Sequence, residues 1–335
     1  MFNKNMIQGS ITVLVTGVGA IIGQGIIKSL RKSYHQVKVV GIDRSDKSLG
    51  PSLCDVFFKK PDCDEDHLDY LTFWRWMLKK EGIDLVLPGL EVDVTFFDKQ
   101  REVFEQVGVV VALNHKEIIE LSSDKWVMGE VLQRYGLPRI PSLIPMEWCE
   151  AVAELGPPPL LFKPKQGNGS RGIHYLNDEA DFHYWRSKVN DNWMLQRIVG
   201  SDLDEYTVGV FGLGDGLALK PIVFRRRLSS AGNTLEAEVV EDSDIESSVM
   251  LLTKLFRPLG PTNYQFRKEG GVVYLLEINP RFSSSNSLRT AFGYNEAEMS
   301  IDYFLFGKVP ADPKIKKGIA WRYSEDFVIH DSNFI

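Results

Sequence analysis

The sequence has few cysteines and no excess of positive charge. Its three cysteines, Cys54, Cys63 and Cys149, are odd in number, far apart and form no Cys-x-x-Cys pair. A disulfide framework needs paired cysteines, so this usage is typical of a reducing cytoplasm. The formal net charge is −6, whereas a protein that binds nucleic acid usually carries a basic patch. We therefore expect a cytoplasmic protein without a nucleic-acid partner.

Long apolar runs and several well-known site motifs are also missing. Residues 11–27 are apolar, but four glycines interrupt them, which favours a strand–turn–helix over a signal peptide. No stretch approaches the ~18 uninterrupted apolar residues of a membrane span. The six histidines show no metal-ligand spacing, and Gly-x-Ser-x-Gly, Walker-type and His-Glu-x-x-His motifs do not occur. We expect no membrane partner.

Two different textures make up the chain. With 335 residues, of which 44% are apolar and 25% charged, it is an ordinary soluble composition for two or three domains. Short apolar strands at 11–15, 37–42, 83–87 and 109–113 alternate with helices, which predicts a parallel α/β sheet. From residue 160 the pattern is antiparallel strands and turns with one amphipathic helix, an α+β texture.

Polar residues follow several strands of the first region. Gly17, Gly19 and Gly23 follow the first strand, and Asp43 ends the second. This favours either an NAD site with Asp43 on the ribose, or a structural turn or one that touches another substrate; the glycine spacing departs from the dinucleotide fingerprint. Glu91 and Asp93 follow the strand 83–87, where ligands of open α/β sheets bind, and a charged surface loop is the other interpretation.

The stretch Tyr274–Phe282 has the densest chemistry. Glu277, Asn279 and Arg281 are two residues apart at the end of an apolar strand, so an extended backbone would place them on one face. A carboxylate and an amide oxygen suit Mg²⁺, and arginine grips phosphate in a fork. A solvated polar fringe is the alternative. Gln265, on the preceding strand, shares the face of Glu277 if the hairpin loop is odd in length.

Two further segments suit a phosphorylated ligand. The strand 160–165 carries Lys163 and leads into residues 166–172, whose three glycines allow backbone amides to converge on phosphates. A merely flexible hairpin explains the same composition. Arg225 and Arg227 are two apart in the strand 220–228, so both would face the cleft and hold an acceptor carboxylate, or both would be edge-strand charges.

Taken in order, these pieces resemble the ATP-grasp superfamily. The resemblance is strongest to the ATP-grasp half of the carbamoyl-phosphate synthase large subunit and to the pyrrolysine-biosynthesis ligase type. It covers about residues 10–310, and Glu-Ile-Asn-Pro-Arg-Phe at 277–282 with Asn-x-Gln at 263–265 carries it. It implies a Rossmann-like pre-ATP-grasp domain (1–121), an ATP-grasp domain (122–310) with a lid-bearing subdomain (122–200) and a metal-site subdomain (201–310), and a C-terminal tail (311–335).

The resemblance also implies the ligands and their residues. The cofactors would be ATP and Mg²⁺ (or Mn²⁺). Lys163 and Arg281 would contact the phosphates in catalysis, and Lys125 would reach the nucleotide from the other side. The nucleotide would also contact the lid residues Gly167, Asn168, Gly169 and Ser170. The backbone of the hinge residues Gln196, Arg197 and Ile198 would read adenine, and Glu205 would lie near the ribose. The metal ligands would be Gln265, Glu277 and Asn279. Related proteins carry an Arg-x-Arg motif at the position of Arg225 and Arg227, so these two residues, with Arg281, would bind the acceptor carboxylate.

The expected function is an ATP- and Mg²⁺-dependent ligase that joins a carboxylate to an amine through an acylphosphate. Its partners would be small molecules, the carboxylate being an amino acid or small metabolite. A carbamoyl-phosphate-synthase-like phosphorylation of a small carboxylate is the enzymatic alternative. A Rossmann-type NAD(P)-binding oxidoreductase and a non-catalytic nucleotide-binding protein are alternatives of other classes. Homodimers are common in the resembled family, so a homodimer stays an open alternative.

Overall fold

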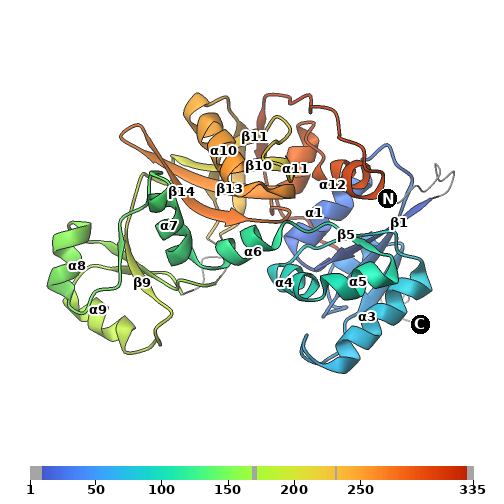
Figure 1. Cartoon of the computed structure of the whole chain (residues 1–335), viewed down its shortest axis with the longest axis horizontal. Helices are drawn as coiled ribbons and strands as arrows, with labels where there is room; N and C mark the ends of the chain where they lie inside the picture. Colours follow the sequence, from blue (N-terminus) through green and yellow to red (C-terminus); the bar gives the residue numbers. More distant parts are fainter. Residues whose placement is uncertain (1–9, 168–171, 231, 330–335) are drawn as a thin grey trace.

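The protein is described by a computed structural model that covers residues 10–167, 172–230 and 232–329. Three sheets are arranged along its long axis, and Figure 1 shows the helix α6 (Lys116–Ser123) and the helix α7 (Lys125–Arg134) between them. Within these described ranges, no helix combines the length and the apolar character that a membrane crossing requires.

The N-terminal sheet is parallel, as its alternating pattern predicts. Its strand order is β3-β2-β1-β4-β5, and the strands span β1 Ile11–Thr16, β2 Val37–Asp43, β3 Val56–Lys59, β4 Leu85–Leu87 and β5 Val110–Val111. Every residue of β1 is buried because helices cover both faces of the sheet. The helices of this region are α1 Ile21–Leu30, α2 Gly50–Leu53, α3 Leu68–Glu81, α4 Glu91–Lys99 and α5 Arg101–Val107.

The chain between β4 and β5 forms two helices, α4 and α5, with a break between them. The break falls at Gln100, whose φ of −115° and ψ of 19° leave the helical region. The break lets Phe97 on α4 and Phe104 on α5 pack into the same core, with ring centroids 4.9 Å apart. Packing against the sheet therefore decides the helix boundary here.

A four-stranded antiparallel sheet forms the second layer. Its order is β6-β9-β7-β8, with β6 Ser142–Leu143, β7 Leu160–Lys163, β8 His174–Leu176 and β9 Met194–Arg197. The helices α8 (Trp148–Leu155) and α9 (Glu179–Arg186) pack on it through Phe182 and Leu155. In Figure 1 this lobe stands apart at the left.

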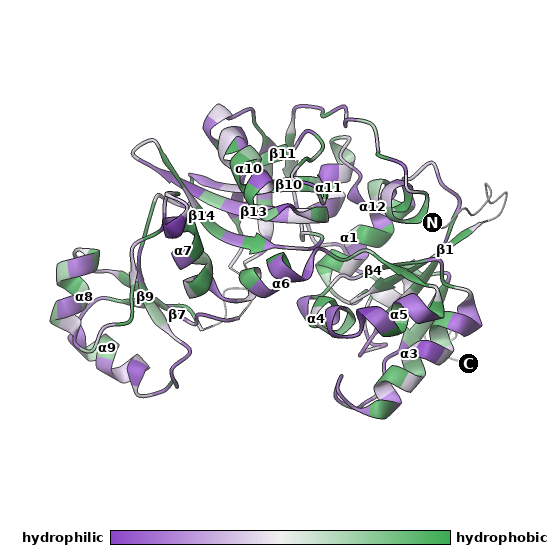
Figure 2. Ribbon diagram, viewed as in Figure 1, coloured by the Kyte–Doolittle hydropathy of each residue, from purple (hydrophilic) through white to green (hydrophobic). Residues whose placement is uncertain are grey.

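A six-stranded antiparallel sheet forms the third layer, in the order β14-β13-β10-β11-β12-β15. Its strands are β10 Glu205–Leu213, β11 Ile222–Leu228, β12 Thr234–Val239, β13 Leu259–Glu269, β14 Val272–Asn279 and β15 Ile319–Trp321. The helix α10 (Ser243–Phe256) starts at the capping side chain of Asp242 and covers one face with its apolar stripe. Figure 2 shows that hydrophobic and hydrophilic residues form separate bands along the helices. The opposite face carries a second apolar cluster, which includes Phe211, Ile222 and Phe224.

The C-terminal helices connect the third sheet to the first. They are α11 (Asn286–Ala291), α12 (Glu296–Ser300) and a π-helical turn, Ile301–Leu305. Phe282, Ala297 and Ile301 are buried in one core with Val13 and Val15 of β1. These C-terminal helices therefore join the sheet that carries the predicted metal row to the N-terminal sheet.

The tail after residue 310 adds the short edge strand β15, which pairs with β12. Trp321 is 63% exposed and Tyr323 is 83% exposed, and neither lines the cavities described below. The predicted domain boundaries stay predictions, and the one near Leu121 falls inside α6.

Candidate functional site

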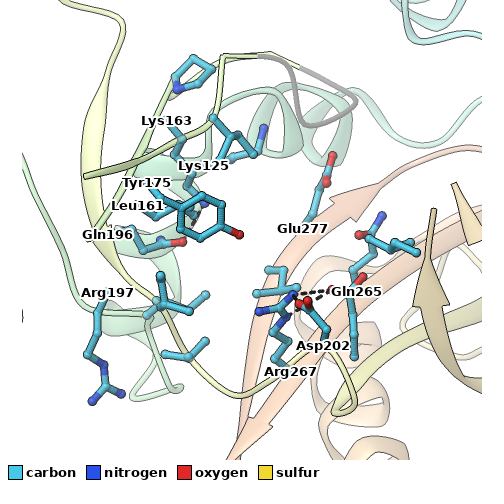
Figure 3. Close-up of a pocket in the computed structure, with 18 of the residues that line it drawn as sticks. Lys125, Leu161, Lys163, Tyr175, Gln196, Arg197, Asp202, Gln265, Arg267 and Glu277 are labelled. Atoms are coloured by element: carbon cyan, nitrogen blue, oxygen red, sulfur yellow. Dashed lines mark hydrogen bonds and ion pairs between the residues drawn. The ribbon is translucent and has the colours of Figure 1, made fainter. Parts of the chain in front are cut away.

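A cleft of about 710 Å³ lies between the four-stranded and the six-stranded sheets. Figure 3 shows side chains from both sheets pointing into it, with Lys163 and Gln196 on one side and Gln265 and Glu277 on the other. Ten of the predicted site residues line this cleft: Lys125, Lys163, Gly167, Gln196, Arg197, Ile198, Glu205, Arg227, Gln265 and Glu277. Asn168, Gly169 and Ser170 of the predicted lid lie outside the described residues.

Lys163, at the end of β7, is a buried cation of this cleft. Its Nζ donates a hydrogen bond of 2.7 Å to Oε1 of Gln196, whose Nε2 in turn donates to Oγ of Ser142. Burial, together with the positive charge of Lys125, lowers the pKa of Lys163 to about 7, and the carboxylate of Glu277 opposes both effects. A polyphosphate in the cleft would restore the charge of this lysine.

A second cation is placed by a helix cap. The carboxylate of Asp124 accepts from the amides of Trp126 and Val127, which begins α7 and sets Lys125 as its first residue. Nζ of Lys125 donates to the carbonyl oxygen of Gly167 at 2.6 Å. This cap thus fixes where the ammonium enters the cleft.

Strand pairing sets the predicted metal row. Gln265 lies directly opposite Glu277 in the β13–β14 ladder, and Asn263 lies opposite Asn279. This register places Gln265 and Glu277 on one face, although the hairpin loop, residues 270–271, is even in length and not odd as the conditional prediction required. A β-bulge follows Gln265 and absorbs the extra residue on β14. Carboxylate and amide oxygens therefore converge on one face, a donor set that suits Mg²⁺.

Buried charged side chains hold the residues next to this row in place. Arg289 of α11 is fully buried, donates to Oδ1 of Asn263 and to Oγ1 of Thr207, and pairs with Glu296 at 3.0 Å. Burial raises the pKa of Glu296, and the guanidinium of Arg289 opposes that rise. The sequence patterns gave no signal for this network because its members lie on four separate elements.

The arginines of β11 need a correction. Arg225 points away from the cleft and pairs with Glu238 at 2.6 Å, while Arg227 lines the cleft and lies 3.8 Å from Glu236. The prediction that Arg225 and Arg227 face the cleft together is therefore wrong for Arg225. The irregularity in the β11–β12 ladder falls just after Arg227, so simple alternation fails near this strand end.

Arg226, between them, is the functional residue that sequence reasoning missed. It is buried, and its Nη2 donates at 2.9 Å both to Oε1 of Glu205 and to Oε1 of Gln265. Glu205 also pairs with Arg267 at 2.9 Å, so the predicted ribose contact is a carboxylate already held by two guanidinium groups. Side chains alternate between the two faces of a strand, so Arg226 lies on the face opposite to Arg225. This alternation is the sequence signal that would have identified Arg226.

The fit of the row to a metal ion follows from these contacts. Gln265 shares its amide oxygen with Arg226, whose charge is neutralised by Glu205, so one lone pair of that oxygen stays available. Asn279 is buried and accepts from Arg281 at 3.1 Å. The oxygen set fits Mg²⁺, and Glu277 is its one carboxylate.

Arg281 lies beside a second, smaller cavity. Its Nε and Nη2 donate to Oε2 of Glu91 at 3.1 and 2.9 Å. Asp93, two residues further, is completely buried and forms an ion pair with Lys60. The interpretation of Glu91 and Asp93 as a charged surface loop is therefore wrong: both belong to the first turn of α4, and each holds a cation.

The first glycine turn is held closed by Asp43, at the end of the neighbouring strand β2. Oδ2 of Asp43 accepts from the amide of Gly19 at 2.8 Å, and Oδ1 accepts from the amide of Ser45. Gly17 has a φ of +65°, and a Cβ on Gly23 would lie 2.3 Å from the carbonyl oxygen of Gly17. These contacts favour the structural interpretation of the turn over an NAD site.

Comparison with protein families gives two matches. Residues 13–112 match the family described as PylC-like, N-terminal domain, and residues 191–327 match the one described as ATP-grasp in the biosynthetic pathway with Ter operon. Together they cover both textures of the sequence.

Curated relatives include carbamoyl phosphate synthase large chains. The protein from Synechocystis sp. is 23% identical over 357 aligned residues, covering 95% of this chain and 32% of the relative. The one from Methanothrix thermoacetophila is 23% identical over 304 residues, covering 81% of this chain and 27% of the relative. This chain spans about a third of the length of these relatives.

Solved structures with the same arrangement include two nucleotide complexes. N5-carboxyaminoimidazole synthetase from Staphylococcus aureus complexed with ADP has a TM-score of 0.71 at 16% identity, covering 93% of this chain and 82% of that one. The biotin carboxylase domain of Hydrogenobacter thermophilus 2-oxoglutarate carboxylase, with MgADP and bicarbonate, has a TM-score of 0.68 at 17% identity, covering 92% and 73%. At these identities the likeness shows the fold, and the matches confirm the predicted fold class and resemblance.

Proposed function

We propose that this chain, which joins a PylC-like N-terminal domain to an ATP-grasp domain, is an ATP- and Mg²⁺-dependent carboxylate–amine ligase. The observation that carries the proposal is the cleft itself. Two lysines, Lys125 and Lys163, line one side, and the oxygen row of Gln265 and Glu277 lines the other. A nucleotide polyphosphate, with its close-packed negative charge, is the ligand that needs cations and metal-binding oxygens together.

Each group then has a physical role. Lys163 and Lys125 would offset the charge of the phosphates, and the backbone of Gln196–Ile198 would meet the adenine. Glu277, Asn279 and Gln265 would hold Mg²⁺ (or Mn²⁺), which supplies charge neutralisation as the γ-phosphoryl group leaves. Arg281 would hold the acceptor oxygens and the transferred phosphoryl group in its fork.

The chemistry follows from this arrangement. A carboxylate oxygen of the acceptor attacks the γ-phosphorus of ATP, and ADP leaves with the electrons of the broken bond. The resulting acylphosphate is then attacked at its carbonyl carbon by an amine, and phosphate leaves. Because water would hydrolyse the acylphosphate, the cleft between the two sheets would have to exclude water during the reaction.

A coupled ADP-release assay over pairs of carboxylates and amines tests this proposal. Glu277→Ala should lower the turnover rate by at least ~10²-fold with an unchanged thermal midpoint, because the carboxylate serves the metal and not the core. Glu241→Ala is the matched control, since Glu241 is an exposed acid of the same domain paired with Lys317. A wild-type rate in Glu277→Ala would refute the metal assignment.

A second candidate function is the phosphorylation of a small carboxylate, as in carbamoyl phosphate synthase. It is favoured by relatives of that name that align with up to 95% of this chain. ADP release that depends on bicarbonate and on no other acceptor would select it. Isothermal binding of NADPH with none for ATP would instead select an oxidoreductase.

The cellular setting rests on the cysteines. Cys54, Cys63 and Cys149 are all free thiols in the structure. This supports our proposal of a reducing, cytoplasmic location.

A further inference from the structure

A second cavity of about 460 Å³ adjoins the nucleotide cleft. Gly167 lies in the wall of both cavities, and its carbonyl oxygen accepts from Lys125. The remaining wall comes from α4, α6, Gln166 and the residues after β14, and Glu91 and Arg281 are hydrogen-bonded to each other in it. A molecule bound here would therefore lie next to the cation-bearing end of the nucleotide cleft.

The wall of this cavity is charged but balanced. Three acidic and three basic side chains line it: Glu91, Asp98, Glu120, Lys99, Lys116 and Arg281. Val94, Ile119 and Pro280 add an apolar part. A balanced wall does not select a ligand of high net charge, but it suits one that carries both signs at once.

Arg281 is held in place independently of Glu91. Its Nη1 donates to the carbonyl oxygen of Phe282 at 2.8 Å, and its Nη2 donates to Oδ1 of Asn279 at 3.1 Å. Glu91 takes the edge formed by Nε and Nη2, the edge on which a carboxylate binds in a fork. Among the described residues, Glu91 has no other hydrogen-bond partner, so it can turn aside while the guanidinium stays.

The pair is accessible to a ligand. The side chain of Arg281 is 14% exposed and that of Glu91 is 26% exposed, so water and solutes reach both. A ligand that supplies a carboxylate to Arg281 and a cation to Glu91 restores both interactions.

We propose that this second cavity binds an α-amino acid as the acceptor, with its carboxylate on Arg281 and its ammonium on Glu91. This inference rests on the proposed ligase function and names the substrate class. Arg281 and Glu91 lie 2.9 Å apart, so a ligand that meets both must carry its carboxylate and its ammonium close together. An α-amino acid does so, because both groups are bonded to one carbon atom. A plain carboxylic acid would place two carboxylates on one guanidinium, and a plain amine would leave Arg281 without its new partner.

The arrangement also protects the reaction. The carboxylate of the amino acid attacks the γ-phosphorus and ADP leaves, which gives an aminoacyl phosphate beside Arg281. The ammonium on Glu91 stays protonated, so it has no lone pair with which to attack a second aminoacyl phosphate. The amine of the other substrate is then the nucleophile, and phosphate is the leaving group.

Hydroxylamine makes the test independent of the unknown amine. Its nitrogen attacks the acyl carbon, phosphate leaves, and a coloured hydroxamate reports the aminoacyl phosphate. The full-length protein with Mg²⁺ and ATP is assayed with each of the common L-α-amino acids and with the same acids lacking the amino group. We expect at least one amino acid to react with a kcat/KM ~10-fold or more above that of its deaminated counterpart.

Substitution of Glu91 then identifies the ammonium site. Glu91→Gln should raise KM for the amino acid ~10–100-fold and remove its preference over the deaminated acid, because a charge-assisted hydrogen bond is lost. Glu91→Asp should keep the preference. The control Glu105→Gln replaces an exposed acid on α5, outside both cavities, and should change neither value. Should Glu91→Gln fail to fold, the wild-type comparison decides alone.

The outcomes separate the two proposals. Equal use of the deaminated acids, an equal rise in KM for both in Glu91→Gln, or ATP binding without any hydroxamate would overturn the amino-acid assignment alone. Absence of ATP binding to the wild-type protein would overturn the ligase proposal itself.

Discussion

Lys163 couples the pH to the affinity for ATP. In the empty cleft its pKa is lowered to about 7 by burial, and by the charge of Lys125, against the opposing carboxylate of Glu277. The phosphates of ATP would lie against its Nζ and favour the charged form. At a pH above 7 the empty cleft holds a neutral lysine, so binding must take up a proton. Affinity therefore falls as the pH rises.

The size of the effect follows from the protonated fraction. With a pKa of about 7, Lys163 is ~90% charged at pH 6 and ~10% charged at pH 8. Because only the charged form binds well, the apparent Kd should rise about tenfold between those values, and ~0.9 proton should be taken up at pH 8. A side chain that stays charged, or stays uncharged, from pH 6 to pH 8 would not change the apparent Kd over that range.

Calorimetric titration of Mg²⁺ and ATP at pH 6, 7 and 8, in buffers of different ionisation enthalpy, measures both quantities. Lys163→Met is the matched control, because it keeps an unbranched side chain but removes the titrating group. Titration of the nucleotide itself is common to both proteins and cancels in the comparison. Equal pH dependence in the two proteins, or negligible proton uptake by the wild type at pH 8, would refute the reasoning.

Three further predictions concern the charged residues Lys163, Arg281 and Arg289. Between pH 7 and 10.5 unfolded Lys163 keeps a proton that the folded protein has lost, so the unfolding free energy should rise with pH by up to ~1.4 kcal/mol per unit relative to Lys163→Met in urea titrations. Arg281→Lys should lower kcat ~10²–10³-fold in the ADP-release assay, because a point charge does not replace the fork; a loss below threefold would contradict that role. Arg289→Met should cost about 3–5 kcal/mol in urea unfolding because it leaves Glu296 buried and unpaired, and adding Glu296→Leu should recover most of it; a loss below ~1 kcal/mol would argue against the pair.

Local rules predicted much of the candidate site. Alternation and hairpin pairing brought Gln265 opposite Glu277, and the capping pattern at Asp124 set the start of α7 and the position of Lys125. These features depend on residues close in sequence or on one strand pairing, so a pattern of two, three or four residues is enough to predict them.

The same rules failed where neighbouring strands end irregularly. Arg225 and Arg227 are two residues apart on one strand, yet only Arg227 lines the cleft. Arg226 is the residue of that run that reaches the candidate metal row, through Gln265. Which of two alternating sets faces inward depends on what the sheet packs against, and the spacing contains no information about that.

By itself the sequence determined the order of strands and helices, the parallel first sheet and the chemical types of the cleft residues, because periodicity and turn residues act locally. Only the tertiary structure decided that Arg281 meets Glu91, 190 positions away in the chain, and that Glu205 is held between Arg226 and Arg267. Those contacts arise where separate sheets and helices are packed together, and their partners are chosen by burial and charge across the whole fold.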